Sequence, residues 1–271
     1  MNIGILTLHY GFNEGAVLQA MALARLIETV VSGTRAEIVD HRYPSKQGVY
    51  GLPGSPREMA IAQAVEDWLP LSKASFRSAK ARPTLNYCRR TYDALVVGSD
   101  VVWNLRYTGH LRRWLGRGVF PRQKDAFFPA FPNVYWPPAE ASRLRVAYAA
   151  SCGNLFWKEI PRTHRRSMAQ RLSGFAEIGV RDERTTSFLR ALSADLYQRA
   201  KIVPDPTIAF KLLDAFDGST ARMKLVAAGY VPGQEHALLI MKETPLSVEV
   251  ARALRARGWR LFATGNHGGL V

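Results

Sequence analysis

The first forty residues decide the fold of this chain, and their order is strand, loop, helix, strand. Residues 2–8 read NIGILTL, a short apolar run of the kind that forms a buried strand. After the loop HYGFNEG at 9–15, the apolar residues of 16–31 recur at spacings of three and four, as in a helix packed on a sheet. Residues 36–40, AEIVD, read as a second strand. This order predicts the opening of a parallel, doubly wound α/β sheet.

The same alternation continues over most of the chain. Four more buried strands are expected, at residues 92–98, 144–150, 178–181 and 202–203. Four helices are expected, at residues 58–69, near Phe76, at 158–173 and at 183–192. Between them, residues 105–142 are rich in proline, arginine and aromatic residues without a period, and are expected to form a long excursion over the surface.

A second α/β domain is predicted to begin near the end of the chain. Residues 1–217 form the first, Rossmann-like domain in this reading, and 218–234, with Gly, Ser and Pro, form a linker. Residues 235–271 then start a new strand–helix–strand unit, with Pro245 as the first helical residue and Gly258 after the last. Two strands and one helix leave a sheet face uncovered, so we expect this second domain to be incomplete.

The charge of the chain favours an anionic partner. Its 271 residues hold 37 Lys and Arg against 22 Asp and Glu, a net charge of +15. Nucleic acid, acidic lipid headgroups and a phosphorylated small molecule all fit that sign. No zinc-finger, RNP-type or basic-zipper pattern is present, so nucleic acid is disfavoured and remains a remote alternative. Arginines on solvated helix faces are the plain alternative to any binding role.

Several classes of protein are excluded by simple counts. Two cysteines, Cys88 and Cys152, rule out a disulfide scaffold, and no paired-histidine motif suggests a metal, so none is predicted. Cys152 reads as a small buried apolar residue rather than a nucleophile. No apolar run reaches the length of a membrane-spanning helix, and no signal-peptide pattern opens the chain. We therefore expect a cytoplasmic protein.

Polar residues follow the first strand at the edge where open α/β sheets bind ligands. His9, Asn13, Gly15 and Gln19 lie in or just after this strand-to-helix loop. Asn13 could cap the helix or bond a ligand hydroxyl, and Gly15 permits close approach of a ligand to the backbone. A tight turn with a capping asparagine explains the same residues, and both readings stay open. The loop lacks G-x-G-x-x-G, which disfavours a dinucleotide.

Two later strand ends carry further candidates. Ser99, Asp100 and Asn104 follow the strand at 92–98, where Asp100 could accept a proton from a sugar hydroxyl. Alternatively, Asp100 caps the next turn and the neighbouring Trp103 serves as packing. Arg181 is the last residue of the strand at 178–181 and could bind a phosphate or carboxylate, or simply pair with Asp182 or Glu183.

Four segments, taken together, resemble the polysaccharide pyruvyl transferase family. Their order and spacing carry the resemblance, which covers about residues 2–210. The segments are GILTLHYG with NEGAVLQA at 4–20, YDALVVGSD with VWN at 92–104, VAYAASCG at 146–153, and VRDE at 180–183 followed by DPT at 205–207.

The resemblance implies a glycosyltransferase-B-like fold with the active site in a cleft between two domains. It implies transfer of the pyruvyl group of phosphoenolpyruvate onto two sugar hydroxyls of a polysaccharide or its lipid-linked precursor, with release of phosphate. No cofactor is implied, because phosphoenolpyruvate is the donor substrate. Asp100 would be catalytic, Arg181 would bind the donor, and the remaining substrate-binding residues would be His9, Asn13, Gly15, Gln19, Ser99 and Asn104. A lipid-linked acceptor would also imply peripheral contact with the inner face of the membrane.

Two departures from the family pattern support an alternative. Val101 follows Asp100 where the family usually has glutamine, and the chain contains no Arg-x-His segment in its second domain. The alternative is a truncated, non-catalytic relative that binds an anionic glycan or precursor without turnover.

Overall fold

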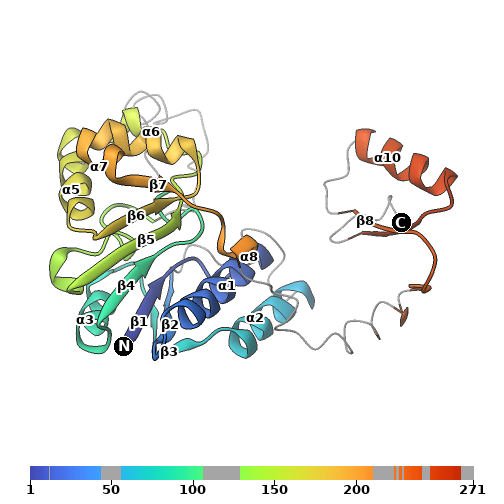
Figure 1. Cartoon of the computed structure of the whole chain (residues 1–271), viewed down its shortest axis with the longest axis horizontal. Coiled ribbons are helices and arrows are strands. Elements are labelled where there is room, and N and C mark those ends of the chain that lie inside the picture. Colours follow the sequence, from blue (N-terminus) through green and yellow to red (C-terminus); the bar gives the residue numbers. More distant parts are fainter. Residues whose placement is uncertain are drawn as a thin grey trace, which may run out of the picture. The chain divides into compact units, whose positions relative to one another are not determined.

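The computed structural model describes residues 1–11, 13–43, 56–105, 129–209, 223, 226–227, 229–239 and 245–263. The chain divides into two compact units, Met1–Leu212 and Leu213–Val271 (Figure 1). Within the expected linker at 218–234, residues 218–222, 224–225 and 228 lie outside the described residues.

The first unit is built on a seven-stranded sheet in the order β3-β2-β1-β4-β5-β6-β7. Every neighbouring pair of strands is parallel. The strands are β1 Asn2–Leu6, β2 Arg35–Arg42, β3 Leu71–Arg77, β4 Ala94–Val97, β5 Leu144–Ala150, β6 Glu177–Val180 and β7 Ala200–Ile202. The chain adds β2 and β3 on one side of β1 and β4 to β7 on the other, so the strand order reverses between β1 and β4. The predicted doubly wound α/β fold is therefore confirmed.

Helices connect these strands, and two of them begin at side-chain caps. The helices are α1 Glu14–Val30, α2 Pro56–Trp68, α3 Arg82–Thr91, α5 Arg162–Ser173, α6 Glu183–Leu192, α7 Ala194–Arg199 and α8 Pro206–Ala209, with 3₁₀ turns η2 Ala139–Ala141 and η3 Trp157–Glu159. Asn13 accepts from the Ala16 N–H at 3.2 Å and starts α1, and Asp182 accepts from the Thr185 N–H at 2.7 Å and starts α6. Figure 1 shows α1 and α2 beside β1–β3, and α5, α6 and α7 beside β5–β7.

The aromatic segment after residue 128 belongs to the core. Phe131, Val134, Tyr135 and Trp136 are buried in one cluster with the β4 side chains and with residues of α3, α5 and α6. The expectation of a surface excursion at 105–142 is therefore wrong for the described part, residues 105 and 129–142, because large apolar side chains of this part fill the layer between sheet and helices. Residues 106–128 lie outside the described part of the chain.

One element was predicted with the wrong type. The stretch near Phe76 is the edge strand β3, not a helix, and it pairs in parallel with β2 through His41 and Phe76. Pairing with a neighbouring strand outweighs local propensity in this short segment. Helices α3 and α7 were not anticipated, because neither carries a long apolar periodicity.

The second unit contains the expected strand–helix–strand. Strands β8 His236–Leu239 and β9 Arg260–Ala263 are parallel neighbours, and α10 Pro245–Ala256 connects them. Ala251 of α10 and Leu261 of β9 are buried against each other's element. Within the described part of the chain, no helix has both the length and the apolar character that crossing a bilayer requires.

Candidate functional site

The loops that follow β1 and β4 are bonded to each other at the point where the strand order reverses. The Gly98 N–H donates to the Leu6 carbonyl at 3.1 Å, and the Thr7 hydroxyl donates to the Ser99 carbonyl at 2.7 Å. Gly98 has φ +123, and a Cβ there would come within 2.1 Å of the Tyr148 carbonyl oxygen. Only glycine fits this position. In parallel α/β sheets this reversal point, at the carboxyl ends of the strands, is the usual place for a ligand.

Asp100 lies directly after this contact and is almost wholly buried. Its backbone has φ +85, its Oδ1 accepts from the Val101 N–H at 2.7 Å, and its carbonyl accepts from the Ser151 N–H at 3.0 Å. The carboxylate therefore bonds the first N–H of the next turn, as the capping alternative expects. It also lies near the fully buried Tyr135: burial, with the charges of neighbouring tyrosines and Asp100 adding, raises the pKa of Tyr135 well above its usual value.

Ser99 and Asn104 flank this turn. Ser99 is fully buried, and Asn104 is buried with its amide against Gly153, where a Cβ would come 2.8 Å from Nδ2. Trp103 is fully buried and packs on Trp136 with ring centroids 5.6 Å apart, so the packing role considered for it is confirmed.

A second polar cluster lies at the ends of β6 and β7. The Arg181 guanidinium lies 3.6 Å from Asp205 Oδ2, and the Gln19 amide of α1 donates to the same oxygen. Asp205 Oδ1 accepts from the Thr207 hydroxyl at 2.7 Å. Arg181 keeps 29% of its side chain exposed, against 15% for Asp205. The ion-pair partner of Arg181 is thus Asp205; Asp182 and Glu183, the partners considered from the sequence, instead begin α6.

The end of β5 joins the two clusters. The Ala150 carbonyl accepts from the Arg181 N–H at 3.1 Å on one side, and Ala150 pairs with Asp100 on the other. Because neighbouring strands are about 5 Å apart, the backbones of Asp100 and Arg181 are separated by about 10 Å. Asp100, Gln19, Arg181 and Asp205 therefore share one stretch of the carboxyl edge, and we refer to these four residues as the β5-edge cluster.

Sequence reasoning missed two members of this neighbourhood. Asp205 was quoted only as part of the DPT segment, although its position directly after a predicted strand was a usable signal. Tyr148, on β5, is the other: partial burial and the Asp205 charge raise the pKa of its phenol, which stays protonated as a hydrogen-bond donor at neutral pH.

His9 follows β1 at the same edge of the sheet, but its side chain is not accessible there. Its side chain is fully buried, with Nε2 3.0 Å from Asp40 Oδ1 and Nδ1 3.2 Å from the Thr7 carbonyl oxygen. Asp40 also accepts from Arg42 Nε at 2.6 Å. Burial opposes the charge of Asp40, but the hydrogen bonds from His9 and Arg42 outweigh it and hold the pKa of that carboxyl well below its usual range. Asn13 caps α1, and Gly15 is exposed in its first turn.

Metal binding and thiol chemistry find little support in the described part of the chain. No group of three His, Cys, Asp or Glu side chains is placed there to hold a metal ion. Cys152 is buried as expected, and burial raises the pKa of its thiol, which favours the unreactive protonated form.

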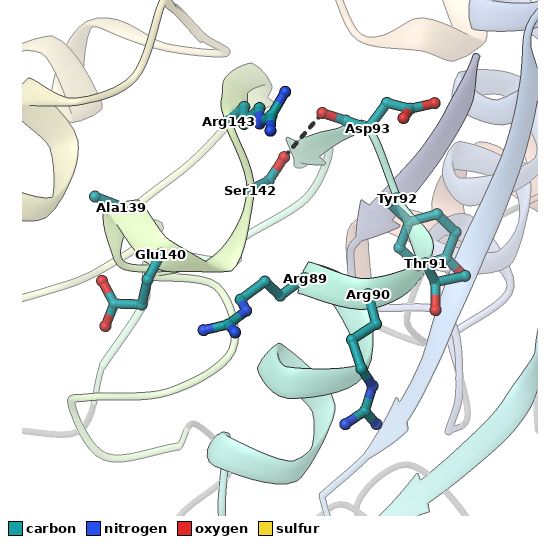
Figure 2. Close-up of a pocket in the computed structure, with 9 residues that line it drawn as sticks. All are labelled: Arg89, Arg90, Thr91, Tyr92, Asp93, Ala139, Glu140, Ser142 and Arg143. Atoms are coloured by element: carbon teal, nitrogen blue, oxygen red, sulfur yellow. Dashed lines mark hydrogen bonds between the residues drawn. The ribbon is translucent and has the colours of Figure 1, made fainter.

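A pocket of about 740 Å³ lies at the opposite, amino edge of the sheet, where β4 and β5 begin. Arg89 and Arg90 of α3 and Arg143 before β5 line it, together with Asp93 and Glu140 (Figure 2). In Figure 2, the Ser142 hydroxyl donates to the Asp93 carbonyl, at 3.1 Å. None of the predicted site residues lines this pocket.

The fold defines this chain as a Rossmann-like α/β protein. No protein-family model matches it, and no curated protein does. Among solved structures it is similar to the UDP-GlcNAc 2-epimerase from Methanocaldococcus jannaschii, with a TM-score of 0.50 and 10% sequence identity. The match covers 98% of this chain and 66% of that chain, so this chain spans just under two thirds of that protein's length. At this identity the likeness concerns the fold alone.

Proposed function

We propose that this protein transfers the pyruvyl group of phosphoenolpyruvate onto a sugar acceptor, a polysaccharide unit or its lipid-linked precursor. The observation that carries the proposal is the β5-edge cluster, which brings a partly exposed arginine and a buried carboxylate to one edge of the sheet. The four family-like segments contain all four of its residues. The fold likeness to a UDP-GlcNAc 2-epimerase agrees with an enzyme that acts on sugars.

The proposed reaction joins the pyruvyl C2 to two sugar oxygens. The enol methylene carbon takes up a proton, positive charge develops at C2, and one hydroxyl attacks there. The C2–O bond to phosphate then breaks, and the second hydroxyl closes the ketal. One hydroxyl proton balances the new methyl group, and the other leaves with phosphate.

Each residue of the cluster has a role in this proposal. Arg181 forms two parallel hydrogen bonds to the phosphate or the carboxylate of phosphoenolpyruvate. Asp100 accepts a hydroxyl proton from the sugar. Asp205 and Gln19 hold the guanidinium in place through the shared oxygen Oδ2.

The test is phosphate release by the full chain with phosphoenolpyruvate and a panel of nucleotide-linked and lipid-linked sugars. We expect release only when donor and acceptor are both present. Arg181→Ala should lower the rate by about 100-fold, as loss of a charged donor to a transferring group does. Arg90→Ala, at the opposite edge of the sheet, is the matched control and should retain the full rate.

Two results would count against the proposal. No phosphate release over the whole panel, with sugar binding retained, would favour the non-catalytic alternative that binds a glycan or precursor. Equal rates for the Arg181 and Arg90 variants would place the donor elsewhere.

A further inference from the structure

An exposed aromatic residue marks the segment that follows β5. Phe156 has 67% of its surface exposed, the largest exposed fraction of any Phe, Trp or Tyr among the described residues. Its neighbour Leu155 and the nearby Ile160 are buried in the core. Arg184 donates to the carbonyls of Gly153 and Leu155, at 2.8 and 3.1 Å, and its guanidinium lies 5.2 Å from the Trp157 ring centre. Phe156 is thus presented to solvent by an ordered loop.

Three basic residues follow Phe156 closely in the sequence, with one acidic residue, Glu159, among them. Lys158, Arg162 and Arg166 are all exposed, and none of them forms an ion pair with another described residue. Arg162 and Arg166 are four residues apart on α5 and therefore lie on the same face of that helix. The first turn of α5 has no acidic residue, so the positive end of the helix dipole adds to the same potential. We call Phe156, Lys158, Arg162 and Arg166 the 156–166 surface.

This surface lies at the same edge of the sheet as the candidate site. It follows the carboxyl end of β5 directly, and Gly153 at its start lies against Asn104. A single exposed phenylalanine on a soluble protein needs no special explanation. An exposed phenylalanine followed by three exposed cations, none of which is paired within the described part of the chain, is different, because an aromatic residue flanked by Lys and Arg is the composition that binds the interface of an anionic bilayer.

We propose that the 156–166 surface docks this protein on an anionic lipid bilayer. Phe156 enters the headgroup region, and the three cations lie against lipid phosphates. The proposal goes beyond pyruvyl transfer and stands whether or not the protein has that activity. If the acceptor is lipid-linked, docking through this surface brings the carboxyl edge of β5 to the membrane.

The test measures co-sedimentation of the full chain with vesicles. One set contains equal parts of phosphatidylglycerol and phosphatidylcholine, and the other contains phosphatidylcholine alone. We expect binding to the anionic set only. Since each basic residue near such a surface strengthens binding about fivefold, the variant Lys158→Glu, Arg162→Glu, Arg166→Glu should bind at least about 100-fold more weakly.

The amino-edge pocket supplies a charge-matched control. The variant Arg89→Glu, Arg90→Glu, Arg143→Glu changes the net charge equally and should bind within about threefold of the wild type, because those residues lie at the opposite edge of the sheet. Equal loss in both triple variants would overturn the proposal, since binding would then follow net charge alone. If the first triple variant does not fold, Lys158→Gln, Arg162→Gln, Arg166→Gln serves in its place, with the same comparison.

A variant of Phe156 distinguishes binding to a bilayer from binding to free phosphate. Phe156→Ala should weaken vesicle binding about tenfold, because a buried aromatic side chain is lost, whereas Tyr197→Ala on α7 should not change it. Unchanged binding by Phe156→Ala, together with full release of the wild type by soluble glycerol phosphate, would show a phosphate site without a bilayer and would reject the proposal.

Discussion

Two regions of the carboxyl edge contain similar polar residues in different environments. Beside β1 and β2, Asp40 accepts from His9 and Arg42 with distances of 3.0 and 2.6 Å. Near β6 and β7, Asp205 accepts from Gln19 and lies 3.6 Å from Arg181. Both carboxylates thus face a neutral or titratable donor and an arginine. The first set surrounds a wholly buried histidine, whereas the second leaves its arginine partly exposed.

This difference indicates which of the two polar clusters is available to bind a ligand. In the Asp40 cluster, Arg42 also donates to Glu66 at 2.8 Å, so its guanidinium is held between two carboxylates. In the Asp205 cluster, the longer ion pair and the exposed guanidinium leave donors of Arg181 free to reach a bound anion. Similar residue types at one edge therefore stabilise the fold at one end and offer a binding site at the other.

The largest expected effect is a loss of stability when the Asp40 cluster is changed. Asp40→Asn should lower the free energy of unfolding by about 3–5 kcal/mol, because it removes one partner of a buried charged network. Urea unfolding measures the change. Glu66→Gln, which removes the 58% exposed partner of the same arginine, should cost less than about 1 kcal/mol. Equal costs for the two variants would mean that the Asp40 cluster does not stabilise the fold as a buried network.

The next largest effect is a pH dependence of the free energy of unfolding, caused by His41, which lies beside the Asp40 cluster. Burial, and then the nearby His9, lower the pKa of His41 to about 4. Because the unfolded chain binds this proton more readily, His41 reduces stability as pH falls from about 6.5 towards 4, by up to about 3 kcal/mol. Urea unfolding across this range should show a shallower pH dependence for His41→Gln than for the wild type. The partly exposed His164, changed to Gln, is the control, and an identical pH profile for His41→Gln and the wild type would contradict the prediction.

The smallest effect on stability is expected when the Asp205 cluster is changed. Arg181→Ala should change the free energy of unfolding by less than about 1 kcal/mol, because its ion pair is long and partly solvated. The same variant should lose most of its affinity for phosphoenolpyruvate, measured by calorimetry. A loss of stability comparable with that of Asp40→Asn would show that Arg181 is structural and would remove the contrast between the two clusters.

The strand and helix pattern could be predicted in outline from local sequence. The apolar run at β1, the helical spacing of α1 and the buried strand at β4 each depend on residues close together in the chain. The candidate residues followed from the same reasoning, because the ends of parallel strands share one edge. Gln19, Asp100 and Arg181 do lie around the end of β5.

Contacts between distant residues were decided only by the tertiary structure. Phe76 lies in a strand because β2 is its neighbour, and Tyr135 and Trp136 are in the core because the space between sheet and helices must be filled. His9 is buried and bonded to Asp40, 31 positions away, and Arg181 pairs with Asp205, 24 positions away, rather than with the acids beside it. Periodicity encodes which face of an element is apolar, but the pairing of charges depends on strand order and burial, which no short stretch of sequence contains.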